Sequence, residues 1–455
     1  MNVVVIGTGY VGLNTAVALA HCGHSVIGID VDQSKVDSLN SGIPTISEQG
    51  LPELLSNLSG SPNLSFTTSY DCISSADVVF VTVGTPSNPD GSANLSYIYS
   101  VVDSIIKVLS HSNLSYDLSI VIKSTVPFGV NSKIERLIRD SLPSSVNDCL
   151  CFASNPEFLR EGTALFDAFY PDRIVIGTTD NSEHILSTLY EPILSRTFPK
   201  LSFVDESKIP TSLPKLLITD QISAEMIKYS SNCFLALKIS FANEIAGLAN
   251  LLGANIKDIT KGMGMDKRIA PYFLNSGLGW GGSCFPKDTL ALISIAKDYN
   301  YDLPITQASL TVNNNQITKL ISSIQSKLHT LHGKRIAIFG ITFKPNTDDV
   351  RNSLSIPLAT KLSKLGATVV LTDPQGLENA KSIYKDSPFI FVNTPEEAAK
   401  EADAIIISTD WKEYKDLNWH RIACLMRSED SRFLFDGRKV LFESHYRELF
   451  DYTYL

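Results

Sequence analysis

The sequence predicts an α/β protein with two doubly wound parallel sheets joined by a long central helix. Residues 2–30 and 334–373 each read as an apolar strand, a helix that ends near a glycine, and a second apolar strand that ends in aspartate. A further apolar strand follows in both halves, at 76–83 and at 402–408. Strands that are apolar throughout and alternate with helices are typical of parallel sheets covered on both faces. Both halves are therefore expected to be Rossmann-like domains.

The central helix is expected over residues 221–255. This stretch has no proline, one internal glycine at Gly247, and apolar residues at helical spacing. A helix of this length would extend for about 50 Å at 1.5 Å per residue, so it could bridge the domains and carry a dimer interface. The segment 199–218 contains three prolines and mixed polarity, and a surface loop is expected there. The predicted organisation is a first domain over 1–200, a loop over 201–220, a central helical domain over 221–325 and a last domain over 326–455.

Composition limits the classes of function. A chain of 455 residues with 44% hydrophobic and 19% charged residues is expected to fold into two or three packed domains. A net charge of −9 disfavours nucleic acid as the main partner, because phosphate neutralisation needs a basic surface. The seven cysteines are odd in number and repeat no metal-binding spacing, so neither a disulfide framework nor a metal is predicted.

The location is expected to be cytoplasmic. The amino-terminal run MNVVVI lacks a basic region before it and leads directly into glycines, so it reads as a strand rather than a signal peptide. No uninterrupted apolar run approaches the roughly 20 residues that span a bilayer. We therefore expect a soluble protein with no membrane partner.

A glycine motif follows the first strand. Gly7-Thr8-Gly9-Tyr10-Val11-Gly12 fits GxGxxG, which allows a tight turn and close backbone approach to a pyrophosphate at a helix N-terminus. The second strand ends at Asp30, whose carboxylate would accept hydrogen bonds from ribose hydroxyls and repel a 2′-phosphate. The motif thus predicts NAD rather than NADP. A glycine-rich turn in a fold that has lost its ligand is the alternative.

Three further blocks are rich in reactive groups. Glu157 and Glu161 are four residues apart and would share a face if this turn is helical, and Lys228 and Asn232 share that spacing on the central helix. Cys284 follows a glycine-rich run and has Lys287 and Asp288 close behind. Small neighbours suit a nucleophilic sulfur, and nearby positive charge favours its thiolate. Singly, each feature is more typical of a core cysteine, a solvated lysine or a surface glutamate pair.

Together these motifs make the chain resemble the UDP-glucose/GDP-mannose dehydrogenase family. The resemblance covers nearly the whole chain, in order. The residues that carry it are GTGYVG (7–12), VGTP (83–86), KSTVPFG (123–129), NPEFLREGTA (155–164), PDRIVIG (171–177), IKYSSN (227–232), GGSCFPKD (281–288), FGITFKPNTDDVRNS (339–353) and FDGR (435–438).

The resemblance implies a four-electron oxidation of a sugar CH₂OH to a carboxylate, with two NAD per turnover. Lys228 is implied as proton-transfer partner or electrostatic stabiliser, helped by Asn232, Asp288 and a water near Thr125 and Glu161. The implied role of Cys284 is to hold the aldehyde as a thiohemiacetal and then as a thioester. Glu157 is implied as the general base that activates the hydrolytic water.

Binding positions carry over in the same way. Arg268 matches an arginine that reaches the substrate from a neighbouring subunit, which implies a homo-oligomer, at least a dimer. Cofactor contacts are implied at Gly7, Gly9, Tyr10, Val11, Gly12, Asp30, Lys35, Val83, Thr85, Pro86, Ser124, Thr125, Glu161, Lys287 and Arg351. Substrate contacts are implied at Phe158, Leu159, Arg160, Lys228, Asn232, Arg268, Phe273, Asn275, Ser276, Gly277, Gly279, Gly281, Lys344 and Arg438.

The substrate remains open within the family. Phe285 and the pair Asp172-Arg173 look more like the branch that oxidises UDP-glucose to UDP-glucuronate than like the GDP-mannose branch, and a UDP-N-acetylhexosamine is a further alternative. Two alternative functions lie outside four-electron oxidation: a two-electron hydroxyacid dehydrogenase and a non-catalytic nucleotide-sensing relative. The chain departs from the family pattern at Ala270, where glycine is usual, and at Trp280, where tyrosine or phenylalanine is common. Its 199–218 loop is also longer than in the compact bacterial members.

Overall fold

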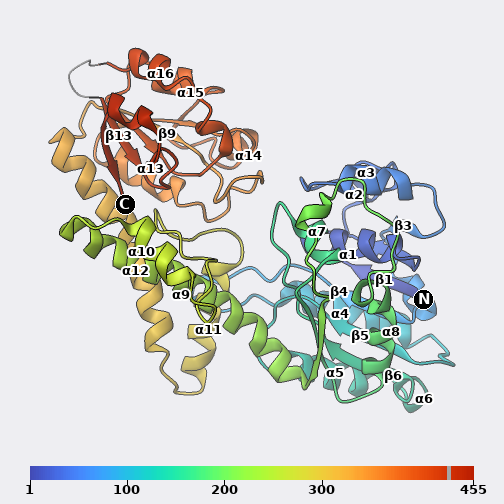
Figure 1. Cartoon of the computed structure of the whole chain (residues 1–455). Helices are drawn as coiled ribbons and strands as arrows, with labels where there is room; N and C mark the ends of the chain where they lie inside the picture. Colours follow the sequence, from blue (N-terminus) through green and yellow to red (C-terminus); the bar gives the residue numbers. More distant parts are fainter. Residues whose placement is uncertain (428–431) are drawn as a thin grey trace. The chain divides into compact units, whose positions relative to one another are not determined.

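The computed structural model describes residues 1–427 and 432–455. The chain divides into two compact units, Met1–Ser230 and Ser231–Leu455 (Figure 1). The division falls inside one long helix, α9 (Gln221–Leu252), so the units share an element but have separate cores.

The first unit is built on an eight-stranded sheet of order β3-β2-β1-β4-β5-β6-β7-β8. Its strands are β1 (Asn2–Ile6), β2 (Ser25–Ile29), β3 (Leu64–Thr67), β4 (Val78–Val81), β5 (Leu118–Ile122), β6 (Leu150–Ser154), β7 (Arg173–Gly177) and β8 (Lys215–Thr219). The parallel sheet predicted from the apolar strands is confirmed from β3 to β6. Strand β7 runs antiparallel to β6, meeting it at Ser154 and Gly177. An antiparallel neighbour needs no long helical crossover, and only one short helix lies between these two strands.

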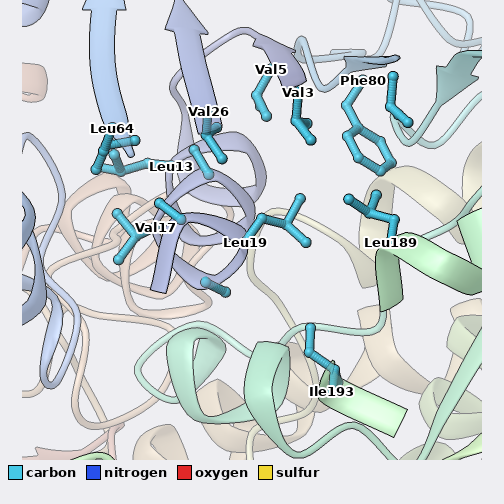
Figure 2. Packing of buried hydrophobic residues seen from close by; sticks show 14 of the residues in the cluster. Val3, Val5, Leu13, Val17, Leu19, Val26, Leu64, Phe80, Leu189 and Ile193 are labelled. Carbon is cyan, nitrogen blue, oxygen red and sulfur yellow. The ribbon is translucent and has the colours of Figure 1, made fainter. Parts of the chain in front are cut away.

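Helices cover both faces of this sheet. They are α1 (Tyr10–His21), α2 (Gln33–Asn40), α3 (Leu51–Leu58), α4 (Ser96–Leu109), α5 (Val130–Ser141), α6 (Ser144–Asn147), α7 (Ala164–Phe169) and α8 (Ser182–Leu194), with the 3₁₀ turns η1 (Asp71–Ser75) and η2 (Glu206–Lys208). Side chains alternate along β1: Val3 and Val5 pack with α1, α3 and α8, whereas Val4 and Ile6 pack with α4 and α5. Figure 2 shows the first of these layers, with Leu13, Val17 and Leu19 of α1 close to β1 and β2.

The expected surface loop is wrong from Lys215 onward. Lys215–Thr219 form β8, an edge strand paired in parallel with β7. Sequence pattern failed here because the strand is only half covered and follows two prolines. Upstream, Leu201 is buried and Phe203 packs on the same core as α1, so part of this segment is anchored rather than solvated.

The second unit contains a six-stranded parallel sheet of order β11-β10-β9-β12-β13-β14. The strands are β9 (Arg335–Phe339), β10 (Thr368–Thr372), β11 (Ile390–Phe391), β12 (Ala404–Ile407), β13 (Phe433–Asp436) and β14 (Asp451–Tyr454). Its helices are α10 (Ile256–Gly264), α11 (Phe285–Asp298), α12 (Pro304–Leu328), α13 (Ser355–Lys364), α14 (Leu377–Ile383), α15 (Pro395–Ala399) and α16 (Trp419–Leu425), with the 3₁₀ turns η3 (Lys412–Tyr414) and η4 (His445–Leu449). The second Rossmann-like sheet is therefore confirmed.

The long helix predicted over 221–255 is confirmed as α9. Over the residues that the structure describes, α9 is long and apolar enough to cross a membrane by length and composition, with a mean hydropathy of 1.2 in its most apolar window. One such helix is weak evidence for a membrane span. Two of its ionisable residues, Glu225 and Lys228, are buried against protein partners, as in the interior helix of a globular protein.

Candidate active site

The glycine motif forms a turn that is closed by backbone contacts. Gly7 has a φ of +96°, and its amide donates to the carbonyl of Ile29 at 2.7 Å. A Cβ on Gly12 would lie 1.9 Å from the carbonyl oxygen of Gly7 and 2.5 Å from Oγ1 of Thr82. Only glycine therefore permits this approach of α1 to the end of β1.

Gly9 has the opposite environment. It precedes the first residue of α1, and a Cβ built on it meets no atom of the described residues within 4 Å. The space that a Gly9 side chain would occupy is therefore open, and no side chain caps the start of α1 in the described residues. Such an N-terminus is suited to a pyrophosphate, so the residues present fit the dinucleotide that the motif predicts.

Asp30 lies at the end of β2, where the ribose contact is predicted. Its carboxylate accepts hydrogen bonds from the backbone and hydroxyl of Thr8 at 3.1 and 2.8 Å and from the amide of Asp32 at 3.1 Å. Nζ of Lys35 lies 3.9 Å from Oδ2 of Asp30, and the lysine side chain is nearly half exposed. Both side chains therefore stand beside the glycine turn.

The other predicted cofactor positions of this unit lie on two linked loops. Oγ1 of Thr85 donates to the carbonyl of Thr125 at 2.8 Å, and Oγ of Ser124 donates to the carbonyl of Val83 at 2.7 Å. These bonds join the loop after β4 to the loop after β5. Because parallel strands end at the same sheet edge, both loops lie on the edge that carries the glycine turn.

Tyr10 leads to a residue that sequence reasoning missed. Its hydroxyl donates to Oε2 of Glu48 at 2.6 Å, and the same buried carboxylate accepts the amides of Gly162 and Ala164 at 3.0 and 2.9 Å. Burial and the charge of Glu48 raise the pKa of Tyr10, so it stays a neutral donor. Glu48 thus ties the glycine motif to the start of α7.

Glu157 and Lys228 form a buried ion pair. Nζ of Lys228 donates to Oε1 of Glu157 at 2.8 Å, and the two side chains are only 4% and 7% exposed. Burial opposes ionisation of Glu157, but the charge of Lys228 and its hydrogen bond outweigh burial, so the pKa of this carboxyl lies below its usual value. Oε2 of Glu157 also accepts the amide of Leu159 at 2.5 Å.

A second buried cation belongs to the same cluster and was not predicted. Nζ of Lys123 donates to Oδ1 of Asn155 at 3.0 Å and to the hydroxyl of Tyr190 at 3.4 Å. Burial lowers the pKa of Lys123 to about 8, although the charge of Glu157 works in the opposite direction. The sequence did contain a signal for this contact, because Lys123 is the first residue of the KSTVPFG motif and Asn155 is the first residue of the NPEFLREGTA motif.

The helical turn considered for residues 157–161 is absent, because α7 begins only at Ala164. The Glu157 side chain bonds the amide two residues on, a local contact that competes with helix formation. Glu161 lies in a turn and Arg160 is exposed, with its guanidinium paired to Asp167 at 2.5 Å.

Phe158 supports two cations. The guanidinium of Arg173 lies 3.8 Å from the centroid of its ring, and Nζ of Lys228 lies 5.6 Å from it. Within the first unit the structure therefore brings together Glu157, Phe158 and Lys228 from the predicted set.

The second unit holds the other predicted catalytic residues. Cys284 is the half-buried residue that precedes α11, where the helix dipole favours negative charge on sulfur. One turn later, the buried Asp288 accepts the side-chain amide of Asn232 at 2.6 Å and the ammonium of Lys287 at 2.6 Å. The structure thus brings together Asn232 and Asp288, predicted to assist Lys228, and pairs Asp288 with Lys287, predicted as a cofactor contact.

The glycine-rich segment before Cys284 is held tightly by its own unit. The amide of Gly277 donates to Oδ1 of Asn243 at 2.6 Å, and Asn313 bonds both backbone groups of Trp280. Arg438, predicted as a phosphate ligand, directs Nε to the carbonyl of Ser408 at 2.8 Å and Nη1 to the carbonyl of Gly279 at 3.0 Å. Burial lowers the pKa of Arg438. Arg438 therefore links this segment, through Nη1, to the end of β12, through Nε.

Other predicted ligands of this unit differ in exposure. Ser276 is buried and accepts a hydrogen bond from Lys439, whereas Asn275 is exposed. The ring centroids of Phe273 and Phe285 lie 6.1 Å apart. Lys344 is half-buried, with Nζ 5.5 Å from the ring of Phe343.

Two predicted arginines form ion pairs close in sequence. Arg268 pairs with Asp266 at 2.6 Å and Arg351 pairs with Asp349 at 2.7 Å. Both guanidinium groups are more than half exposed, so each stands on the surface of the described chain.

Comparison with known proteins gives one consistent result. Residues 1–194, 222–315 and 337–443 match the NAD binding domain, the central domain and the UDP binding domain of the UDP-glucose/GDP-mannose dehydrogenase family.

The chain is 44% identical to the UDP-glucose 6-dehydrogenase YwqF of Bacillus subtilis over 96% of this chain and 93% of that one. It is 37% identical to the UDP-glucose 6-dehydrogenase AglM of Haloferax volcanii over the full length of both. The solved UDP-glucose dehydrogenase of Pyrobaculum islandicum superposes with a TM-score of 0.86 at 35% identity, covering 99% of this chain and 96% of that one.

These likenesses span the whole chain and agree with the open glycine turn at the start of α1. The chain belongs to the UDP-glucose/GDP-mannose dehydrogenase family and is an oxidoreductase that uses NAD.

Proposed function

We propose that this chain oxidises UDP-glucose to UDP-glucuronate, consuming two NAD per turnover. The observation that carries the proposal is the buried Glu157–Lys228 pair, which lies in the same unit as the open glycine turn. A charged pair hidden from solvent is costly to maintain for stability alone and is typical of catalytic sites. The names of the relatives support UDP-glucose as the substrate.

In the first oxidation the primary hydroxyl loses its proton and its carbon loses a hydride. Lys228 stabilises the alkoxide that develops on oxygen, or receives its proton once its own has been released. Asn232, held by Asp288, orients the oxygen, and a water near Thr125 and Glu161 passes the proton outward. NAD, when bound, supplies the hydride acceptor for this oxidation and for the next one.

The second oxidation passes through Cys284. Its sulfur adds to the aldehyde carbon, a C–S bond forms, and the oxygen takes up a proton to give a thiohemiacetal. Loss of the carbon-bound hydrogen as hydride and of the oxygen-bound proton leaves a thioester. Because the aldehyde is bonded to the chain, it cannot escape between the two steps.

Hydrolysis releases the product. Glu157 takes a proton from a water that attacks the thioester carbon, the C–S bond breaks, and the thiolate recovers a proton. The lowered pKa of Glu157 keeps the carboxylate ionised and able to accept this proton. The proton taken by Glu157 passes to the thiolate of Cys284, and the carboxylic acid product then ionises by releasing its proton to solvent.

For the UDP moiety we propose binding by the second unit. Lys344 and the remaining N–H donors of Arg438 match positions that suit phosphate oxygens. The glycine segment from Asn275 to Gly281 offers backbone groups to the sugar and diphosphate. Phe158, Leu159, Arg160 and Phe273 complete the proposed contacts.

We further propose a homodimer that forms through α9 and works in the cytoplasm. Phe234, Phe241, Leu248 and Leu252 recur on α9 at spacings of seven, seven and four, and all are exposed, Phe234 by 61%. Such a stripe is typical of a helix that packs against a second helix. Arg268 would reach the partner's substrate after leaving Asp266. The seven free thiols suit a reducing compartment.

Substrate choice is tested by NADH formation with UDP-glucose, GDP-mannose and UDP-N-acetylmannosamine at equal concentrations. We expect the highest kcat/KM with UDP-glucose. Preference for GDP-mannose would overturn the substrate assignment but not the family. Binding of NAD and UDP-glucose without NADH release would favour a sensor.

The covalent step is tested by Cys284→Ser. Serine is a weaker nucleophile than a thiolate, so kcat for the complete oxidation should fall by about a thousandfold or more, in line with the loss of a catalytic nucleophile. Binding of UDP-glucose, measured by calorimetry, should change less than about threefold, within 0.7 kcal/mol. Full turnover by this variant would exclude the sulfur intermediate.

A further inference from the structure

The carboxylate of Glu225, on the second turn of α9, is buried against the loop that follows β5. It is 4% exposed. Oε2 accepts the amide of Gly129 at 2.6 Å, while Oε1 accepts the amide and the side-chain Nδ2 of Asn131 at 3.0 and 2.9 Å. Three donors from one short stretch therefore converge on a single carboxylate of another helix.

These bonds cap α5 from outside. Gly129 precedes the first residue of α5, has a φ of +77°, and has no side chain with which to cap the helix itself. A carboxylate at this position satisfies amides of the first turn and interacts favourably with the helix dipole. The start of α5 is thereby fixed to α9.

The capped stretch is the end of the KSTVPFG motif, which carries Ser124 and Thr125. At its other end this loop is tied to the loop after β4 by the bonds from Ser124 to Val83 and from Thr85 to Thr125. Glu225 thus holds the carboxyl-terminal end of the loop, at Gly129, while the amino-terminal end carries the proposed cofactor positions Ser124 and Thr125.

On α9, Glu225 lies three residues before Lys228, about one helical turn. Tyr229 packs its ring edge-on against Phe128 of the same loop, with centroids 5.4 Å apart. Gly177 lets the helix approach β7, since a Cβ there would lie 2.5 Å from the Cβ of Ala224. The start of α9 is therefore seated on the first unit by contacts on both sides of Glu225.

We propose that Glu225 is a positioning residue that sets Lys228 against the Thr125 loop. It touches neither substrate nor cofactor. It acts by fixing the helix that carries the proposed proton-transfer lysine to the loop that carries the proposed water-binding threonine. The inference rests on the proposed function, because it assigns no activity of its own.

Burial raises the pKa of Glu225 to about 7, and its three hydrogen bonds only partly oppose this shift. Among charged neighbours, Asp220, just before α9, raises the pKa of Glu225 further. The packed elements also carry the ionisable residues Lys123 in the loop, Lys228 and Tyr229 on α9, and Lys133, Glu135, Arg136, Arg139 and Asp140 on α5. The folded pKa lies above that of an unfolded glutamate, so the stabilisation from the protonated form is complete below pH 4.5 and lost as pH rises through 7. Above pH 7 the ionised carboxylate accepts all three hydrogen bonds, but the folded state is then less stable than it is at acidic pH.

The test is Glu225→Gln, with Glu135→Gln as the matched control. Glu135 is a carboxylate of α5 that also contacts α9, through Gln221 at 3.3 Å, but it makes no bond to the 123–129 loop in the described contacts. We measure kcat, both KM values and the NAD-binding stoichiometry from pH 5.5 to 8.5, and express kcat per NAD-binding site. Thermal unfolding is followed over the same range.

We expect kcat of Glu225→Gln at pH 8 to fall between about tenfold and a hundredfold, the penalty typical of a misplaced catalytic group, with both KM values nearly unchanged. The wild-type to variant ratio of kcat should shrink towards one below pH 6.5, where Glu225 becomes protonated. Groups common to both proteins cancel from this ratio. Wild type should also lose thermal stability relative to Glu225→Gln between pH 5.5 and 8, whereas Glu135→Gln should match wild type throughout.

A kcat ratio near one at every pH, or the same ratio for both variants, would overturn the inference. So would a Glu225→Gln protein that melts far below wild type at all pH values, because Glu225 would then serve the fold alone. If wild type itself fails to oxidise UDP-glucose, the proposed function fails instead, and the two failures are distinguishable.

Discussion

The two Rossmann-like sheets begin alike and then diverge at the same structural position. In the first unit Gly7 donates to Ile29 at 2.7 Å, and in the second Gly340 donates to Thr372 at 2.8 Å. Each sheet then places an aspartate at the end of its second strand, and a threonine after the glycine donates to it through backbone and hydroxyl. The turn is therefore the same piece of local structure in both units.

The difference lies in what else reaches the aspartate and in where the next helix starts. Asp373 accepts further bonds from Ile341, Gln375, Gly376 and the indole of Trp411, so its own unit surrounds it with donors. Helix α13 begins at Ser355, far from the turn, whereas α1 begins at Tyr10, directly after it. In the first unit the helix starts beside Gly9, where a Cβ would meet no described atom within 4 Å, whereas the second turn is filled by groups of its own unit. A shared strand order does not make a shared ligand site.

The largest expected effect on NAD affinity comes from closing the first turn with Gly12→Ala. The added Cβ overlaps the carbonyl of Gly7, and overpacking of this kind costs about 1–3 kcal/mol of stability. Relief of the overlap moves the turn that would hold the pyrophosphate, so NAD affinity should fall by roughly two orders of magnitude. Titration of NAD against intrinsic fluorescence measures this loss. Gly262→Ala is the matched control, because Gly262 is also a helical glycine but a Cβ on it meets no described atom within 4 Å. Unchanged NAD affinity would mean that the cofactor does not use this turn.

A matched pair of variants, Asp373→Asn and Asp30→Asn, should separate structure from binding. Asp373→Asn replaces an acceptor by a donor inside a buried network, so the free energy of unfolding should fall by about 2–4 kcal/mol while NAD affinity stays the same. Asp30→Asn should weaken NAD by about tenfold, or 1.4 kcal/mol, with a smaller loss of stability. Denaturant unfolding and NAD titration on both proteins check this. Equal effects of the two variants on NAD would contradict the comparison.

The smallest expected effect concerns Ala270 in the second unit, where the resemblance to the family leads us to expect glycine. Ala270 adopts a φ of +60°, a left-handed conformation that glycine accepts without strain. Ala270→Gly should therefore raise the free energy of unfolding by about 1 kcal/mol, provided that the gain exceeds the added entropy of the unfolded chain. A lower stability of this variant, seen in denaturant titration, would show that the alanine methyl group contributes packing.

Sequence patterns predicted the parts of the fold that depend on local chemistry. The first strand and Gly7 to Gly12 could be placed because periodicity and glycine geometry act within a few residues. The same holds for the helix that carries Lys228. The turn around Glu157 was harder, since the side chain bonds its own backbone and replaces a helical pattern.

The buried carboxylates Glu48 and Glu225 could not be found in this way. Their backbone partners lie about one hundred residues away in sequence, at Gly162, Ala164, Gly129 and Asn131. Nothing in the sequence around either glutamate marks it as buried, so only the folded chain reveals that they hold the site together.

The most direct test of the proposed chemistry is the number of NADH molecules formed per UDP-glucose consumed by wild-type protein under limiting UDP-glucose. Two oxidations on one carbon, with the aldehyde held on Cys284, predict two NADH per sugar and no aldehyde trapped by an added amine. One NADH per sugar, with free aldehyde in solution, would contradict the covalent four-electron mechanism and would favour a two-electron dehydrogenase.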